Sequence, residues 1–189
     1  MPDELYIPVI EGTTRPKRMS LLVAKFLVEI GQSIEGVKTE LVDPTHYSLP
    51  GDGNDEENKD PKYSKITKEA DGFFVIVPEY NHGYPGTLKR LLDSEMKNYI
   101  HKPVSFAGVS AGPWGGTRGI ENLVPVVREL GLVATFGDVQ FPVVQKLFNS
   151  DGIIEDEEQR QIYTRRANKA WNELIWMAKT LKWGRDNLK

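Results

Sequence analysis

The stretch LYIPVIEGTTRPKRMSLLVAKFLVEI, residues 5–30, joins an apolar run at its start to a helical pattern at its end. The run LYIPVI (5–10) has the length and composition of a buried strand. From Ser20 onward, apolar residues recur at spacings of three and four, as on one face of a helix. The segment between them carries a hydroxyl pair, Thr13 and Thr14, and three basic residues. These features predict a strand, a polar turn and a helix in succession.

The same alternation continues along the chain. Apolar runs bounded by turn residues predict further strands at 39–43, 72–78, 104–110 and 133–142. Helical spacing predicts helices at 20–34, 62–70, 85–99, 118–130 and 156–182. Strands that alternate with helices form parallel sheets covered on both faces. We therefore expect an α/β fold: a three-layer α/β/α sandwich with a five-stranded parallel sheet of flavodoxin-like order 2-1-3-4-5, forming a single domain over residues 1–189.

Three local features refine this prediction. Ser20 is of the type that caps helices, so we expect it to cap the first one. Pro8 lies inside the first strand, where a missing N–H predicts a bulge or a displaced end of pairing. The polar stretch GDGNDEENKDP (51–61) reads as a mobile surface loop, and it lacks the glycine and terminal glutamate spacing of an EF-hand calcium loop.

Composition excludes several classes of function. The chain has 189 residues and a formal net charge of -3, which argues against a nucleic-acid partner. It has no cysteine, so disulfides, thiolate nucleophiles and cysteine-bound metals are excluded, and we expect no metal site. The N-terminus lacks a signal-peptide pattern and no segment is apolar enough to span a membrane. We expect a cytoplasmic protein with no membrane partner.

The three most unusual stretches follow the first, third and fourth strands, where an open sheet of this order places its ligand crevice. The first, EGTTRPKRMS (11–20), offers hydroxyls, arginines and a helix start, which together suit a phosphate. The alternative is a helix cap with solvated arginines. It is neither a Walker A motif nor the G-x-G-x-x-G of dinucleotide folds.

The other two stretches suit a flat ligand. PEYNHGYPG (78–86) combines prolines, glycines and Tyr80, which fix a backbone path and offer an aromatic face. It is alternatively a rigid turn whose tyrosines pack against a neighbouring subunit. SAGPWGGTRG (110–119) allows close backbone approach, and Trp114 can wall one side of a ring. Its alternative is a plain glycine-rich turn.

These three stretches resemble motifs of the NADPH-dependent FMN reductase family. GTTRPKRMS is similar to its phosphate loop G-S/T-x-R-x-x-R-x-S, and SAGPWGGTRG to its S-x-G-x-x-G-G-x-R loop. PEYNHGYPGTLKRLLD (78–93) resembles its signature P-E-Y-N-x-x-x-P-G-x-L-K-N-x-x-D. The resemblance covers the motifs from about residue 5 to 142. It implies non-covalent FMN, NADPH or NADH as co-substrate, a small-molecule electron acceptor (free flavin, quinone, azo compound or metal oxyanion), and a homodimer or homotetramer.

Carried over by position, the resemblance implies three groups of cofactor-binding residues. The FMN phosphate is bound by Thr13, Arg15 and Ser20, with Arg18 as a helper. The isoalloxazine ring is bordered, largely through backbone, by Pro78, Glu79, Tyr80 and Asn81. Its pyrimidine side is closed by Ser110, Gly112, Trp114 and Gly115. The sequence departs from the family at Arg90, where asparagine is usual, and at the bulky 111–114 segment, so the acceptor is left open.

The chemistry implied by the resemblance belongs to the flavin, so no side chain is assigned as catalytic. His46, His82 and His101 form no convincing triad with a serine and an aspartate; His82 either lines the pocket or is a solvent-exposed turn residue. A flavodoxin-type electron carrier without NAD(P)H activity is the alternative function, although such carriers are strongly acidic and lack arginine in the phosphate loop. A phosphate-sensing or interaction protein leaves the second and third stretches unexplained.

The helix at 85–99 suggests how copies of the chain associate. Its apolar side chains exceed what packing on one sheet requires, and tyrosines stand at its two ends. We expect the surplus to meet a twofold-related copy. The residues concerned are Tyr84, Leu88, Leu91, Leu92, Met96 and Tyr99.

Overall fold

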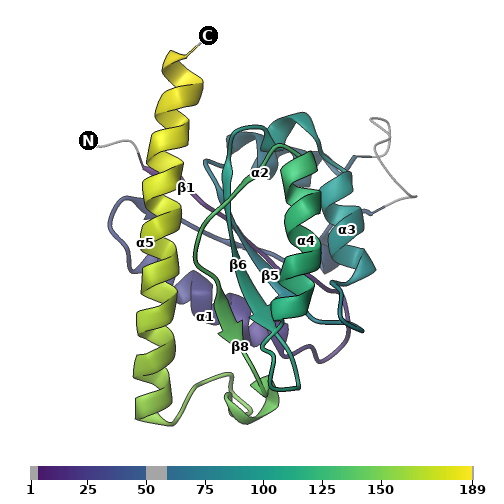
Figure 1. Ribbon diagram of the computed structural model, residues 1–189, viewed down its shortest axis with the longest axis vertical. Helices are drawn as coiled ribbons and strands as arrows, with labels where there is room; N and C mark the ends of the chain where they lie inside the picture. The colour runs from purple at the N-terminus through teal and green to yellow at the C-terminus, as the bar shows by residue number, and fades with distance from the viewer. Residues whose placement is uncertain (1–3, 50–58, 189) are drawn as a thin grey trace.

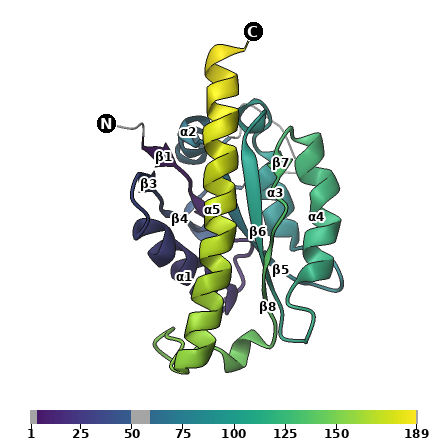
Figure 2. The same ribbon diagram turned by 60° about the vertical axis from the view of Figure 1, so that its left-hand side comes forward.

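A computed structural model describes residues 4–49 and 59–188 and shows a parallel sheet between two layers of helices (Figures 1 and 2). The central strand β5 (Phe73–Pro78) pairs along its whole length with β6 (Pro103–Val109). β2 (Val9–Ile10) pairs with β5 and with β4 (Leu41–Val42), while β7 (Val133–Ala134) and β8 (Val139–Phe141) both pair with β6. Taking β7 and β8 as one interrupted strand, the order is the predicted 2-1-3-4-5.

Pro8 divides the first predicted strand into β1 (Leu5–Tyr6) and β2, and β1 pairs with β3 (Val37–Lys38). The predicted bulge is wrong, because the register is the same on both sides of Pro8. Residues 5, 7, 9 and 11 all donate backbone hydrogen bonds of 2.9 Å toward the β3–β4 side. Pairing with β5 begins only after Pro8, whose carbonyl accepts from Phe74 N–H at 3.0 Å. The displaced end of pairing is therefore confirmed.

Two cores form because successive residues of a strand face opposite sides of the sheet. Along β5, Phe74 and Ile76 face one helical layer, whereas Phe73, Val75 and Val77 face the other. The first layer consists of α1 (Ser20–Gln32) and α5 (Glu157–Asn187). The second contains α2 (Pro61–Glu69), α3 (Gly86–Asp93) and α4 (Thr117–Glu129). Short 3-10 turns lie at Pro44–His46, Lys97–Tyr99 and Val144–Lys146.

Most predicted helix ends lie within two residues of the observed ones, and three differences are larger or concern a cap. α5 runs to Asn187, beyond the predicted residue 182. α3 stops at Asp93, and the chain beyond it is held by the Glu95 carboxylate, which accepts hydrogen bonds from Ser64 in α2 and from Asn98. Ser20 does not cap α1: the cap position is Met19. Most of the predicted loop 51–61 lies outside the described residues.

The surplus apolar face expected on the third helix is not exposed. Leu88, Leu91 and Leu92 are fully buried in the core beside the sheet, as is Tyr99. Of the side chains predicted to meet a second copy, Met96 is the one left about half exposed. The physical argument for a partner on this helix is therefore wrong, whatever the oligomeric state. Among the described helices, none is both long and apolar enough to cross a membrane.

Trp171 fixes α5 against α1. Its side chain is fully buried, its indole N–H donates to the carbonyl of Leu27 at 3.2 Å, and its ring packs on Phe74. Gly31 makes room for it: an added Cβ would lie 2.6 Å from the indole ring and 2.9 Å from Thr39 Cγ2. Close packing of the two helices thus requires glycine at this position.

We predict that Gly31→Ala lowers the free energy of unfolding by about 1–2 kcal/mol, because overpacking outweighs the gain in helix propensity. Gly184→Ala is the matched control, since it lies in α5 and an added Cβ would have no neighbour closer than 3.8 Å. That variant should be as stable as the parent or more stable. Urea denaturation followed by circular dichroism measures both. Equal stabilities for the two variants would contradict the packing argument.

Candidate functional site

Three loops meet beyond the carboxyl ends of β2, β5 and β6: loop 1 (residues 11–19), loop 2 (79–85) and loop 3 (110–116). Loops 1 and 2 are joined by a hydrogen bond between the hydroxyls of Thr13 and Tyr80, 3.2 Å apart. Loops 2 and 3 are joined at the sheet, where Glu79 N–H donates to the carbonyl of Val109 at 2.8 Å. The sequence-predicted site residues therefore lie at one edge of the sheet.

Gly12 brings loop 1 against β5. A Cβ at this position would lie 2.3 Å from the carbonyl oxygen of Ile76 and 2.7 Å from the ring of Pro78. Only glycine allows two backbones to approach so closely. The contact places Thr13 directly beside the start of loop 2.

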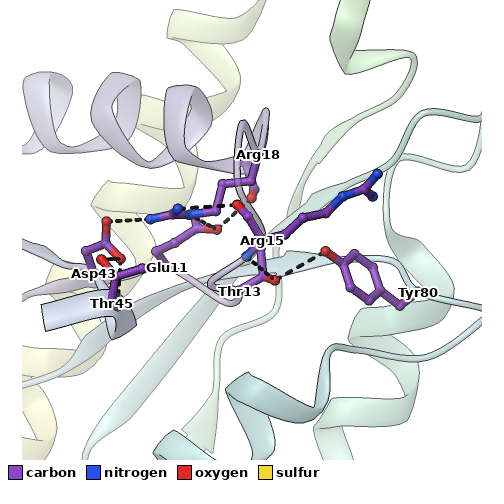
Figure 3. Close-up of polar contacts among 8 residues, drawn as sticks. Glu11, Thr13, Arg15, Arg18, Asp43, Thr45 and Tyr80 are labelled. Atoms are coloured by element: carbon purple, nitrogen blue, oxygen red, sulfur yellow. Dashed lines mark hydrogen bonds and ion pairs between the residues drawn. The ribbon is translucent and has the colours of Figure 1, made fainter. Parts of the chain in front are cut away.

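The solvent-facing side of loop 1, which we call its open side, carries hydrogen-bond donors that have no partner among the described residues. Arg15 is exposed, and its guanidinium makes no hydrogen bond or ion pair with any described residue. The backbone N–H groups of Thr14, Lys17, Arg18 and Met19 likewise donate to no described group, whereas that of Arg15 donates to Thr13 Oγ1 at 3.3 Å. In Figure 3 the Arg15 side chain extends toward the Tyr80 side of the loop. Free N–H groups before a helix, together with an arginine, suit an anion.

The inner side of loop 1 holds a buried charge cluster, which we call the Glu11 cluster and which consists of Glu11, Arg18, Ser20 and Asp43. Glu11, Arg18 and Asp43 are labelled in Figure 3. Arg18 forms an ion pair with Asp43, and its Nε lies 3.6 Å from Glu11 Oε1. The Ser20 hydroxyl donates to Glu11 Oε1 at 2.6 Å. Thus two residues predicted to contact the phosphate, Arg18 and Ser20, contact carboxylates in this structure.

Glu11 is fully buried and its second oxygen, Oε2, has no hydrogen-bond partner among the described residues. Burial raises the pKa of its carboxyl group to about 7. The nearby Asp43 carboxylate also raises it, whereas the Ser20 hydroxyl, Arg18 and the Thr13 N–H lower it. Desolvation of the charged form is the largest of these effects.

Loop 2 makes a tight hairpin turn. Tyr80 and Gly83 exchange two backbone hydrogen bonds of 2.9 Å, and the two residues between them, Asn81 and His82, have φ values of 50° and 68°. Positive φ at both central positions is what a type I′ turn requires. The turn fixes the backbone after Pro78 and directs the Tyr80 hydroxyl toward loop 1.

Loop 3 is held by backbone contacts. Gly115 and Gly116 have φ values of 60° and 84°, and a Cβ on Gly116 would lie 2.3 Å from the backbone nitrogen of Val109. The Ser110 hydroxyl donates to the carbonyl of Gly112 at 2.8 Å. A Cβ at Gly112 would meet open space, so this glycine borders a free volume.

Arg118 ties loops 2 and 3 together and was not among the predicted site residues. Its Nε donates to Glu79 Oε1 at 2.7 Å, Nη2 pairs with the same carboxylate, and Nη1 lies 2.7 Å from His82 Nε2. The guanidinium also lies over the ring of Trp114, 5.7 Å from its centroid, and Trp114 as a residue is 60% exposed. The final arginine of the quoted S-x-G-x-x-G-G-x-R motif was the available signal for this role.

Glu11 and Asp43 were also missed. Glu11 stands at the end of an apolar run, where nothing in the spacing shows that its carboxylate turns inward. Asp43 follows a different strand and meets Arg18 only through the pairing of β2 with β4. The predicted ring-side residues Pro78, Glu79, Tyr80 and Asn81 are brought beside Ser110, Gly112, Trp114 and Gly115, through the contacts described above.

We predict that Arg118→Leu lowers the free energy of unfolding by about 1–3 kcal/mol, because it leaves the Glu79 carboxylate buried and unpaired. The lower part of this range is expected, since Arg118 is 38% exposed and water screens the pair. Arg118→Lys should recover only part of the loss, because lysine lacks the planar fork. Arg128→Leu, an exposed site on the same helix, is the control in chemical denaturation. A loss as large in the control would mean that the ion pair contributes nothing.

Comparison with known proteins agrees with this architecture. The chain is 32% identical over 120 residues to an NADPH azoreductase of Bacillus sp. (strain OY1-2), covering 61% of this chain and 64% of that protein. It is 36% identical over 121 residues to an NAD(P)H-dependent FMN reductase of Schizosaccharomyces pombe, covering 58% and 59%. The matches thus span less than two thirds of both relatives.

Solved structures give the same fold. The flavoenzyme NAD(P)H:(acceptor) oxidoreductase of Paracoccus denitrificans superposes with a TM-score of 0.75 at 18% identity, over 92% of this chain and 98% of that one. The sequence model of the family described as NADPH-dependent FMN reductase matches residues 5–147. The chain belongs to the NADPH-dependent FMN reductase family.

Proposed function

We propose that this chain is a flavoprotein oxidoreductase in which residues 1–189 form one flavodoxin-like FMN-binding domain. It takes a hydride from NADPH or NADH and passes electrons to a small-molecule acceptor, such as free flavin, a quinone, an azo compound or a metal oxyanion. The observation that carries the proposal is in loop 1, next to loops 2 and 3: the Arg15 guanidinium and several nearby backbone N–H groups have no partner among residues 4–49 and 59–188. Family membership and the activities named for the two relatives support it.

The residues of loop 1 fit a phosphate on its open side. A phosphate carries three strong acceptor oxygens and about two negative charges near neutral pH, and it needs several donors at once. Arg15, the Thr13 hydroxyl and the free N–H groups supply such a set. The Ser20 hydroxyl contributes only when it is released from Glu11, and Arg18 acts mainly by holding the loop against Asp43.

Loops 2 and 3 fit a flat ring. Pro78, Glu79, Tyr80 and Asn81 present backbone groups from a fixed turn, because the Glu79 side chain is bound to Arg118 and the Tyr80 hydroxyl to Thr13. On the facing side, Gly112 leaves free volume and Trp114 offers an exposed aromatic face. Ser110 and Gly115 shape this side of the site, and the backbone N–H and carbonyl of Ser110 are bonded to Phe141 and Val144. These groups bind and orient a ring system and exclude water from one side of it.

FMN, when bound, supplies the centre that accepts a hydride and then donates electrons. The protein itself positions the cofactor: loop 1 anchors the phosphate, and loops 2 and 3 set the plane of the ring. No described side chain is assigned to proton transfer. Association as a homodimer or homotetramer and a cytoplasmic location stay predictions.

The direct test is the absorption spectrum of the purified protein after FMN addition, followed anaerobically by NADPH and, separately, NADH. Bands of bound oxidised flavin that bleach with the nicotinamide are expected. Bound flavin that does not bleach would favour a flavodoxin-type electron carrier instead. Absence of FMN binding would overturn both functions.

We predict that Arg15→Ala weakens FMN binding about tenfold to a hundredfold while the fold is retained, because a charge-assisted hydrogen bond is lost. Lys17→Gln removes one positive charge from the same loop and is the matched control; its effect should be much smaller. Titration of FMN followed by flavin fluorescence gives both dissociation constants. Unchanged affinity in Arg15→Ala would show that loop 1 does not hold the phosphate.

A further inference from the structure

Glu11 is a buried carboxylate at the base of the proposed phosphate site. It is fully buried, it directly precedes Gly12, and its backbone N–H donates to the carbonyl of Val42 in the neighbouring strand. Its position is therefore fixed by the sheet. A carboxylate is an unusual group to bury under a loop that binds an anion, because like charges oppose each other most strongly away from water.

The donors around Glu11 belong to the loop that would hold a phosphate, and one of them, the Ser20 hydroxyl, could serve either acceptor. The Ser20 hydroxyl donates to Oε1 at 2.6 Å, Arg18 Nε lies 3.6 Å from the same oxygen, and the Thr13 N–H faces the carboxylate. Ser20 has a single hydroxyl proton, so it cannot donate to Glu11 and to a phosphate at the same time. Glu11 therefore competes with the phosphate for this donor.

The charge balance of the Glu11 cluster also disfavours an ionised Glu11 beside a bound phosphate. Arg18 is the one cation that acts on Glu11 among the described residues, and its guanidinium is ion-paired with Asp43. Two carboxylates thus share one guanidinium, and Glu11 Oε2 has no hydrogen-bond partner in the described part of the chain. A proton on Glu11 would remove the excess negative charge and make its carboxyl group a weaker acceptor, so that the Ser20 hydroxyl is more easily released to a phosphate.

We propose that Glu11 is a proton-linked positioning residue: the neutral carboxyl group is the form compatible with a phosphate in loop 1, so FMN binding takes up a proton from solvent onto Glu11. This inference rests on the proposed binding of FMN. It needs no contact between Glu11 and the phosphate, since the effect acts through Ser20, Arg18 and the charge itself. Glu11 is thereby a pH-sensitive determinant of cofactor affinity.

The pH dependence of FMN binding follows from the pKa of Glu11 in the free protein and in the complex. Burial already raises the pKa of Glu11 to about 7 in the free protein, and a bound phosphate dianion raises it further. Below pH 7 the carboxyl group is largely neutral before binding, so little proton uptake is expected. Above pH 7 it is ionised in the free protein, and binding must take up most of one proton. The phosphate's second ionisation, near pH 6, lies below this range and does not contribute.

The experiment is calorimetric titration of the protein with FMN at pH 8 in two buffers of different ionisation enthalpy, which counts the protons exchanged. Uptake of most of one proton per FMN is expected. Between pH 7 and 8.5 the dissociation constant should rise about tenfold. Riboflavin, which lacks the phosphate, should bind without this uptake.

Glu11→Gln mimics the neutral carboxyl group. Its FMN dissociation constant should change less than about twofold over the same pH range, with no proton uptake. Asp138→Asn is the matched control: burial raises the pKa of Asp138 to about 6, but the residue contacts none of the three loops in the described interactions. It should keep the parent's proton uptake.

The outcomes separate this inference from the proposed function. FMN binding without proton uptake in the parent protein, or equal uptake in Glu11→Gln, overturns the role of Glu11 and leaves the function standing. No FMN binding at any pH overturns the function itself. If Glu11→Gln fails to fold, the parent protein still tests the inference. Proton uptake with FMN but not with riboflavin supports it, and equal uptake with both ligands overturns it.

Discussion

The close approach of loop backbones to the sheet is the constraint on which the site depends. Gly12 lies against Ile76 of β5, and Gly108 in β6 lies against loop 3, where an added Cβ would come 2.3 Å from the carbonyl oxygen of Gly115. Neither contact leaves room for a side chain. Because both loops are pressed onto adjacent central strands, the groups they carry share one edge of the sheet. The tight turn of loop 2 and the Arg118 to Glu79 pair then complete the arrangement.

Loop 1 divides its charges between two sides. Arg18 faces inward to the carboxylates of Glu11 and Asp43, whereas Arg15 faces outward and makes no described side-chain contact (Figure 3). The inward arginine keeps the loop in place, because a buried carboxylate without a partner is costly. The outward arginine is available to a ligand, because no described group engages its guanidinium. Arg18 therefore stabilises the loop, whereas Arg15 is left to bind a ligand.

Much of the fold could be predicted from periodicity and order. An apolar run such as GFFVIVP predicts a strand that is buried on both faces. β5 is such a strand, because Phe73 and Phe74 lie in the cores on opposite sides of the sheet. The loops were located because the carboxyl ends of parallel strands define the crevice. What failed were the features that depend on tertiary partners. Ser20 has the chemistry of a helix cap, yet Glu11 takes its hydroxyl. The chain beyond α3 is likewise held by Glu95 turning toward α2, a contact invisible to helical spacing.

The rim between loops 2 and 3 bears on the choice of acceptor under the proposed function. All three guanidinium nitrogens of Arg118 (Nε, Nη1 and Nη2) are engaged, by Glu79 and His82, so the guanidinium offers its flat face more than its donors. Trp114 adds an exposed aromatic surface beneath it. A site that presents flat surface and few free donors discriminates weakly between molecules of similar shape, because little of its recognition depends on hydrogen bonds to one substituent. Glu79 Oε2, which is buried and has no hydrogen-bond partner among the described residues, is the exception. Flavins, quinones and azo compounds share a flat conjugated face, and this rim selects for that face rather than for a particular substituent.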